Sequence, residues 1–384
     1  MKRISILTNL FVVLSVYLIC SCKSTSDSGL NGYQDFRENA DSIRFADFKV
    51  VRLQSESPLG EVAKLSVTDS IIFVKTIDAL YSFDMDGGFV AQYGVKGRAS
   101  NEYQYVTTFY VDTEAKQVCL IDATQEKLLY FKYDGTFLRK ASFEGLAEKI
   151  LYDAHLLPDN RLFVHNRVFG NSGNLFSILD LKDGSQKDFR PVSISTDDVA
   201  ETCGEKMFNV YNGRISYLMP FEPYVYSFEN NEETVRYKFA DVGKVLNRRK
   251  QKKIKDYSIY KAFELTEDGV FAGFSGIYET SSFVFLNELT EYSYCILDKG
   301  TNKFRRYHYS ISNDDDECTR LPIISIKCSY GDWLIGMGSP MKLLQYKSVD
   351  ITGNDPDLKM LESVIESTSF DSDPVLFFYK IASI

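Results

Sequence analysis

A duplicated segment between residues 71 and 143 constrains the fold of this chain more than any other feature. The first copy has apolar runs on either side of the turn Asp84–Gly87, and the second has the same arrangement around the turn Lys132–Gly135. The Asp-Gly dipeptide in each turn supplies the left-handed backbone conformation that a tight β-hairpin needs. The duplication therefore predicts a β-sheet unit that recurs along the chain.

Four more degenerate copies of this unit follow. The expected strands are short runs of apolar, β-branched and aromatic residues. Copy by copy, they are 71–74, 79–83 and 89–93; 118–121, 127–131 and 137–141; 162–165, 175–179 and 187–190; 215–218, 225–228 and 234–239; 270–274, 282–286, 292–297 and 303–309; and 333–336 and 341–346. Spacings of roughly 40 to 55 residues with four strands per unit are typical of β-propeller blades. A repetitive fold also suits 384 residues, because single cores stop growing at roughly 250 to 300 residues.

Two further segments have strand composition but no hairpin partner of their own. They are Phe45–Leu53 near the start and Val375–Ile381 near the end. A ring of blades must pair its last open strand edges, so we predict that the two segments share one blade. The predicted fold is an all-β, six-bladed β-propeller over residues 43–384.

The alternative fold is a two-sheet sandwich with a helical domain, which needs a substantial helix. The best candidate is 242–257, whose cationic run we interpret as the exposed face of a surface helix rather than as a membrane or anion patch. A second short helix is expected at Leu358–Ile365, after the capping stretch 354–357.

The first residues have the pattern of a secretory signal. Lys2 and Arg3 precede an apolar run, Leu10–Ile19, that is too short for a comfortable membrane span. We expect a signal peptide over 1–21 rather than an uncleaved anchor helix, and a flexible tether over 22–42, which is rich in Ser, Asn and Asp. The sequence around Cys22 resembles a bacterial lipobox, which implies lipidation of Cys22 and attachment to a membrane; Cys20 is a weaker candidate.

Beyond the leader the cysteines do not form a recognisable framework. They are Cys119, Cys203, Cys295, Cys318 and Cys328, and no two of them have C-x-x-C spacing. A disulfide-rich scaffold or a zinc ribbon is therefore not expected. Buried thiols are the favoured interpretation, with a bridge between Cys318 and Cys328 as the alternative.

Several of these features together resemble the six-bladed β-propeller lipoproteins that are abundant in gut Bacteroidetes. They are the lipobox, the phrase YSFDMDGGFVAQYGVKGRASNEYQYVTTFYVD, its echo LLYFKYDGTFLRKASF and the ending DSDPVLFFYKI. In that family the first inter-blade loop commonly reads Gly-x-Gly-Pro-Gly-Glu-Tyr; here Gly97, Glu102 and Tyr103 match, whereas residues 99–101 replace the Pro-Gly part. The resemblance implies six blades and a location in the cell envelope, and it implies no particular activity.

Motifs for metal binding or nucleophilic catalysis are absent. His155, His165 and His308 lack metal-ligand spacing, and the acidic run 313–317 lacks the alternating order of a calcium loop. There is no G-x-S-x-G, S-x-x-K or phosphate-binding glycine loop. We expect no metal and no cofactor, and the formal net charge of −9 argues against nucleic acid as a partner.

The candidate ligand site is the loop after the first copy of the repeat, since inter-blade loops gather at one mouth of a propeller channel. Arg98 is expected to hold a carboxylate or hydroxyl, Glu102 to accept hydrogen bonds, and Tyr103 and Tyr105 to stack on a ring. The alternative is that Glu102 and Tyr103 only attach the loop to the neighbouring blade.

The sequence therefore predicts a monomeric, non-catalytic module that is anchored at Cys22 on the periplasmic or outer face of a bacterial outer membrane. Its expected partner is a glycan, a peptide or another envelope protein. The alternative is a carbohydrate-active lyase or hydrolase with its site at the channel mouth.

Overall fold

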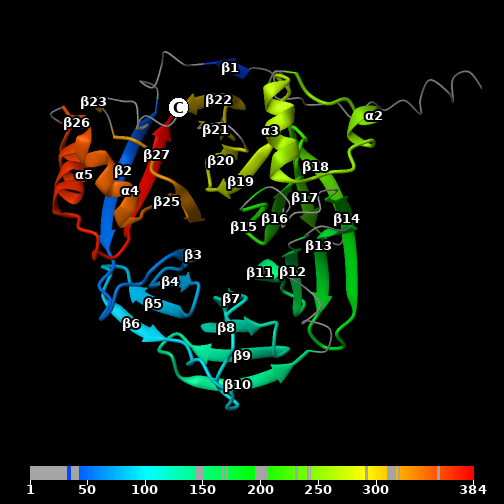
Figure 1. The fold of residues 1–384 in the computed structure, drawn as a ribbon, viewed down its shortest axis with the longest axis vertical. Helices are drawn as coiled ribbons and strands as arrows, with labels where there is room; N and C mark the ends of the chain where they lie inside the picture. Colours follow the sequence, from blue (N-terminus) through cyan, green and yellow to red (C-terminus); the bar gives the residue numbers. More distant parts are fainter. Residues whose placement is uncertain are drawn as a thin grey trace, which may run out of the picture.

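Six sheets of four antiparallel strands stand in a ring, so the chain folds as a six-bladed β-propeller, as predicted (Figure 1). The computed structural model describes residues 33–35, 43–143, 151–166, 168, 172–194, 204, 206–229, 232–239, 242, 244–289, 293–308, 317–318, 321–352 and 355–384. Cys22, the signal peptide, Cys203 and residues 313–316 lie outside these ranges. Within these ranges, no helix is long and apolar enough to cross a bilayer.

Each blade is built from strands that follow one another outward from the axis, except where the ends of the chain meet. The strands are β3 (Val62–Val67), β4 (Ile71–Thr76), β5 (Leu80–Asp84) and β6 (Phe89–Gln92) in blade 1; β7 (Thr108–Asp112), β8 (Gln117–Asp122), β9 (Lys127–Lys132) and β10 (Phe137–Ser142) in blade 2; β11 (Leu151–Leu156), β12 (Arg161–Asn166), β13 (Ser172–Asp180) and β14 (Gln186–Ser193) in blade 3; β15 (Phe208–Tyr211), β16 (Arg214–Leu218), β17 (Tyr224–Glu229) and β18 (Glu232–Lys238) in blade 4; β19 (Phe274–Glu279), β20 (Phe283–Glu288), β21 (Ser293–Asp298) and β22 (Lys303–His308) in blade 5; and β24 (Ile326–Tyr330), β25 (Trp333–Gly338), β27 (Val375–Ser383) and β2 (Arg44–Arg52) in blade 6. Outside β22, β1 (Tyr33–Asp35) adds a parallel strand, and β23 (Glu317–Cys318) pairs with β26 (Asp350–Ile351).

The hairpin turns of the duplicated segment use glycine for its left-handed backbone, as expected. Gly87 has φ +90° and Gly135 has φ +84°. A Cβ on Gly87 would lie 2.1 Å from the carbonyl oxygen of Arg52, so the turn of blade 1 also needs glycine to approach β2.

The innermost strand of each blade is what the sequence pattern missed. In the first four copies the structure adds β3, β7, β11 and β15 ahead of the predicted strands, and in the fifth copy the first strand is β19 rather than 270–274. Inner strands face the channel, and they carry polar residues such as Lys64 and Asp153 within otherwise apolar runs. Their patterns are therefore less continuous than those of the middle strands.

The predicted strand at 341–346 is wrong. This segment forms helix α4 (Pro340–Gln345) and the 3-10 turn η2 (Tyr346–Ser348). Ser339 accepts a hydrogen bond from the Lys342 amide and Pro340 occupies the first turn, an arrangement that starts a helix. The helix predicted at 358–365 is confirmed as α5 (Pro356–Ser367), which begins after the cap Asp355.

The predicted helix at 242–257 is also wrong. The alternative fold, a two-sheet sandwich with a helical domain, depended on this helix and is therefore not supported. Among the described residues of this segment only α2 (Arg248–Gln251) is helical, because the cationic run has few apolar residues to bury. The longer helix, α3 (Ile259–Glu267), starts after Ser258 and buries Ala262 and Leu265 against a small apolar cluster.

Pairing of the two ends of the chain closes the ring, as predicted. Strand β2 runs antiparallel to β27 in blade 6 (Figure 1). Phe48 packs on Phe377 with ring centroids 6.3 Å apart, and the ring centroids of Phe48 and Tyr379 are 5.4 Å apart. The Asp373 carboxylate then accepts hydrogen bonds from the amides of Ser55 (2.9 Å) and Leu59 (3.1 Å), which joins the C-terminal loop to the segment leading into blade 1.

The cysteines within the described ranges are buried thiols, which confirms the interpretation favoured from the sequence. Cys119, Cys295, Cys318 and Cys328 are all buried, and no disulfide joins Cys318 to Cys328. These two lie in different apolar clusters, which explains why they do not meet.

Replacing a buried aromatic side chain where β2 pairs with β27 should destabilise the whole propeller. Phe377 is fully buried, and we expect Phe377→Ala to lower the free energy of unfolding by about 3 to 5 kcal/mol in chemical denaturation. The control is Phe370→Ala, at a position 76% exposed, which should change it by less than about 0.5 kcal/mol. Equal effects of the two substitutions would contradict the role of this pairing.

Candidate functional site

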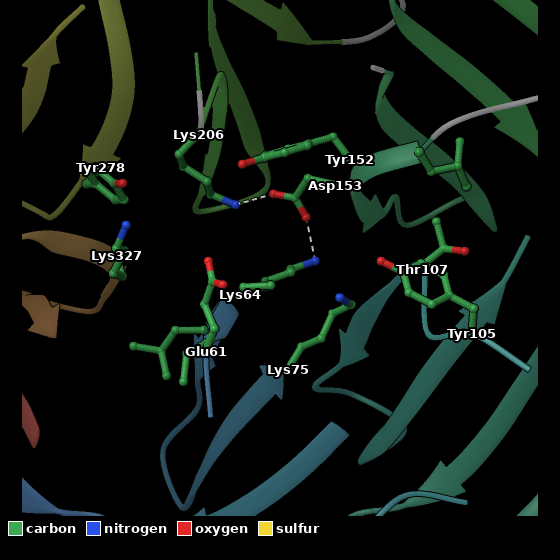
Figure 2. A pocket seen from close by; sticks show the side chains of 14 residues that line it. Glu61, Lys64, Lys75, Tyr105, Thr107, Tyr152, Asp153, Lys206, Tyr278 and Lys327 are labelled. Atoms are coloured by element: carbon green, nitrogen blue, oxygen red, sulfur yellow. Dashed lines mark hydrogen bonds and ion pairs between the residues drawn. The ribbon is translucent and has the colours of Figure 1, made fainter. Parts of the chain in front are cut away.

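A cavity of about 320 Å³ opens at one mouth of the axial channel (Figure 2). All six blades contribute to it, mostly through their inner strands and the loops that lead into them. Its lining residues are Glu61–Leu65 and Lys75 from blade 1, Tyr105 and Thr107 from the loop into blade 2, Leu151–Asp153 from blade 3, Lys206 ahead of blade 4, Tyr278 from blade 5 and Lys327 from blade 6.

Three charged side chains meet at this cavity. Asp153 Oδ1 forms an ion pair with Lys64 Nζ, and Asp153 Oδ2 forms one with Lys206 Nζ (Figure 2). Lys64 also donates to Thr108 Oγ1 at 3.3 Å. We call these three residues the axial triad. Because they come from blades 1, 3 and 4, the axial triad joins blades on opposite sides of the ring.

Each lysine of the axial triad rests on an aromatic ring. Lys64 Nζ lies 4.5 Å from the centroid of Phe109, and Lys206 Nζ lies 4.9 Å from that of Phe208. A ring face attracts a cation, so these contacts compensate part of the hydration that the ammonium groups lose.

The axial triad fixes the charge of its members. Burial alone would raise the pKa of Asp153, but the ammonium groups of Lys206 and Lys64 outweigh burial and hold this pKa well below its usual range. Burial lowers the pKa of Lys64, and Asp153 opposes that shift. Burial, together with the charge of Lys206, lowers the pKa of His155 to about 4, so this imidazole is neutral at neutral pH.

The predicted loop residues divide into two groups. Tyr105 is 47% exposed and lines the cavity. Its ring centroid lies 5.8 Å from Lys75 Nζ. Tyr103 is 1% exposed and packs in the apolar cluster between blades 1 and 2, and Arg98 is exposed on the loop and does not line the cavity.

Glu102 holds the loop in shape. Its Oε2 accepts a hydrogen bond from the Ala99 amide at 2.7 Å, and a Cβ on Gly97 would lie 2.0 Å from that oxygen. The match of Gly97, Glu102 and Tyr103 to the family pattern therefore has a structural explanation. Ligand contact by Arg98, Glu102 and Tyr103 stays a prediction.

Asp122 positions Tyr105, and the sequence pattern did not single it out. Its buried carboxylate accepts hydrogen bonds from the amides of Gln104 (2.6 Å), Tyr105 (3.4 Å) and Gln125 (3.1 Å). The signal in the sequence was weak, because Asp122 is one aspartate at the end of an apolar strand. Two members of the axial triad had a similar signal, since Lys64 and Asp153 lie inside the runs VAKLSV and LYDAHL.

A second cavity, of about 720 Å³, lies at the other end of the inner strands. Its lining includes the turns between the first and second strands of blades 2, 3, 4 and 6, with His155, Tyr211, Glu279 and Tyr330. His165 is buried beside Tyr152 and Phe176. Within the described ranges, no group of three possible metal ligands gathers.

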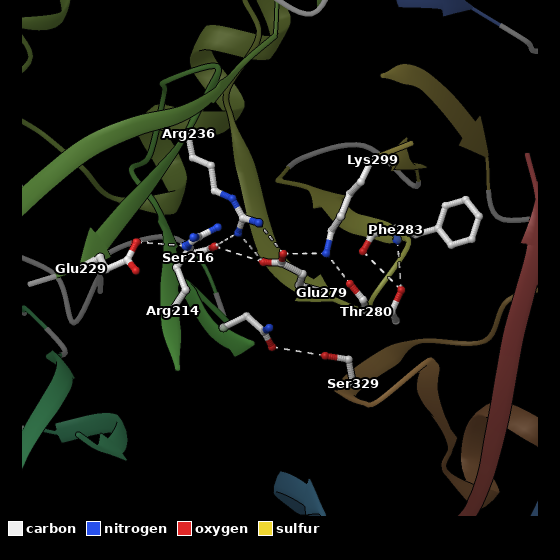
Figure 3. A network of polar contacts seen from close by, with 10 residues as sticks. Arg214, Ser216, Glu229, Arg236, Glu279, Thr280, Phe283, Lys299 and Ser329 are labelled. Carbon is white, nitrogen blue, oxygen red and sulfur yellow. Dashed lines mark hydrogen bonds and ion pairs between the residues drawn. The ribbon is translucent and has the colours of Figure 1, made fainter. Parts of the chain in front are cut away.

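Glu279 at this second cavity is the centre of a buried polar network between blades 4 and 5 (Figure 3). Its two oxygens accept from Arg236 at 2.7 Å each, and Lys299 lies 2.7 Å from Oε1. Ser216 donates to Oε2 at 3.1 Å. Burial alone would raise the pKa of Glu279, but the bonds from Arg236 and Lys299 hold it below its usual range.

The fold and the axial cavity define the class: a six-bladed β-propeller with a polar pocket at one channel mouth. The chain belongs to the family described as a domain of unknown function, DUF4934, whose model matches residues 39–380.

Solved structures support the fold. A protein described as exported, from Bacteroides fragilis, superposes with a TM-score of 0.67 at 18% identity, over 92% of this chain and all of that one. A member of the DUF4221 family from Bacteroides vulgatus gives 0.54 at 10% identity, over 89% of this chain and 98% of that one. No curated protein matches the sequence.

Removing the carboxylate at the centre of the network between blades 4 and 5 should strongly destabilise the fold. We expect Glu279→Gln to lower the free energy of unfolding at pH 7 by about 3 to 5 kcal/mol, because Arg236 and Lys299 lose their buried partner. Glu279 stabilises the fold above its ordinary pKa of 4.5, and this contribution is lost as the pH falls towards the lower pKa of the folded state. When the free energy of unfolding is measured by denaturation between pH 7 and pH 3, it should therefore fall less steeply with pH in the variant than in the parent protein.

The matched control is Glu229→Gln. Glu229 pairs with Arg214 at 3.2 Å on the surface, where ion pairs contribute about 0 to 1 kcal/mol. A Glu229→Gln effect as large as that of Glu279→Gln would contradict the assignment.

Proposed function

We propose that this protein is a binding module of the bacterial cell envelope and that its ligand, a glycan, a peptide or a segment of another envelope protein, enters the 320 Å³ cavity. The observation that carries the proposal is the convergence of side chains from all six blades on one concave polar site. Small-molecule sites have this form, with a few placed polar groups in a preformed pocket.

The state of Asp153 favours binding over hydrolysis. A general acid must carry a proton near neutral pH, and the two lysines keep this buried carboxyl ionised. A carbohydrate-active lyase or hydrolase has one observation in its favour, since Tyr105, Tyr152 and Glu61 line the same cavity. Turnover of the retained ligand by the purified protein would support that alternative.

The envelope location rests on the leader. The apolar run and the lipobox at Cys22 support cleavage, lipidation and attachment to the outer membrane on its periplasmic or outer face. The tether then separates the lipid from the propeller.

Ligand capture tests the site. The full chain, purified from a native-like extract, should retain a ligand that native mass spectrometry detects. Tyr105→Ala, at the proposed mouth, should reduce the retained fraction about tenfold, because an aromatic contact at the rim is lost. The control is Tyr330→Ala, since this residue is 36% exposed and lines the opposite cavity. A ligand lost from Tyr330→Ala and kept by Tyr105→Ala would contradict the proposed mouth.

Metabolic labelling tests the anchor. Cys22→Ala should abolish incorporation of labelled palmitate and release the protein from the membrane fraction, because the acylated residue is gone. Cys20→Ala serves as the control and should leave labelling intact. Palmitate that still enters the Cys22→Ala protein would show that the lipobox assignment is wrong.

A further inference from the structure

The cavity at the proposed mouth carries an excess of positive charge in an acidic protein. The chain has a formal net charge of −9, yet four lysines and two carboxylates line this cavity. Figure 2 shows the ammonium groups of Lys64, Lys75 and Lys206 near Asp153, whereas that of Lys327 lies apart from them, beside Tyr278. The lysines are Lys64, Lys75, Lys206 and Lys327, and the carboxylates are Glu61 and Asp153.

The two carboxylates do not balance this charge where it is buried. Glu61 is exposed, so water screens it. Asp153 is buried, but each of its oxygens already has a lysine partner, and Oδ1 also accepts from the Ala154 amide at 2.8 Å. The axial triad therefore contains two cations and one anion, and it retains one net positive charge.

The two lysines of the axial triad differ in their remaining hydrogen-bond capacity. Lys64 donates to Asp153, Thr108 Oγ1 and the Phe109 carbonyl, which uses its three donors. Among the described residues, the acceptor of Lys206 is Asp153 alone, so Lys206 keeps donors that can reach into the cavity.

We propose that the cavity is an oxyanion site that binds the carboxylate, sulfate or phosphate group of a compact ligand, with Lys206 as its principal donor. This inference rests on the proposed function and specifies the chemistry of the ligand. An oxyanion supplies the missing negative charge and accepts the spare Lys206 donors, and lysine binds such groups as a point charge.

The size of the cavity limits what carries the oxyanion. About 320 Å³ is near the lower end of the range for small-molecule sites, so the occupant is one ring or one terminal unit of a longer chain. The half-exposed ring of Tyr105 stands at its edge and offers a face to that unit.

A purely structural role for the axial triad makes a different prediction. A cross-link between blades needs Asp153 and its two lysines but gains nothing from an added anion. A site with one uncompensated, partly buried cation is stabilised when an anion binds, and the gain in stability rises with the logarithm of the anion concentration above its Kd. Ligand-dependent stabilisation therefore separates the two roles.

The test uses the full chain with inorganic phosphate, sulfate and glucuronate as probes and glucose as the neutral match, at ionic strength held constant with sodium chloride. We expect saturable binding of at least one anion by calorimetry, a rise in Tm with its concentration, and no effect of glucose. Comparison of glucuronate with phosphate and sulfate distinguishes a carboxylate ligand from a tetrahedral one.

Lys206→Met is the decisive variant. It leaves Lys64 paired with Asp153, so the remaining pair is neutral and the propeller should fold, while anion affinity should fall about tenfold or more because a charged donor is lost. Lys303→Met, at the exposed first residue of β22, is the matched control and should bind the anion as the parent does. If Lys206→Met does not fold, Lys327→Gln at the rim replaces it, with a loss of affinity as the expected result.

Two results would overturn the inference: no anion binds saturably, or Lys206→Met binds as tightly as the parent protein. Suppose that no anion binds, but that the parent protein retains a ligand from the extract and Tyr105→Ala loses it. The oxyanion site is then wrong and the proposed function stands. If no ligand is retained either, both are wrong.

Discussion

The propeller depends on the antiparallel pairing of β2 with β27. Six twisted sheets have apolar faces that only neighbouring sheets can cover, and a ring has no uncovered face only when it is closed. Here the first and last strands of the ring complete the same blade, with Phe48, Phe377 and Tyr379 packed at the seam. Closure in turn brings the inner strands of six blades around one axis, which is what creates the cavities.

The axis is polar, and its polar groups serve as cross-links as well as lining. Asp153 joins blades 1, 3 and 4, and Glu279 joins blades 4 and 5. Both carboxylates are buried, and both have their pKa held low by cations, so each contributes to stability only while ionised. In each network two cations surround one carboxylate: Lys64 and Lys206 contact Asp153, and Arg236 and Lys299 contact Glu279.

The architecture could be predicted from the sequence because the middle and outer strands repeat an apolar pattern around recognisable turns. The ring closure followed from two strand-like segments without partners. The inner strands could not be located in this way, since channel-facing charges such as Lys64 and Asp153 interrupt them. Met341–Tyr346 was misread because its apolar residues fit a strand equally well until the cap at Ser339 is considered. The axial triad brings together residues far apart in sequence, and no local pattern reports such a contact.

The closing blade also determines how the molecule responds to mechanical load. Force applied at Arg44 enters the ring through β2, the outermost strand of blade 6. A pull along this strand shears its ladder to β27, so that many hydrogen bonds resist together rather than one at a time. Strand β27 is held in turn by β25 on its other side. The seam of the ring is thus oriented to withstand a pull on its first strand.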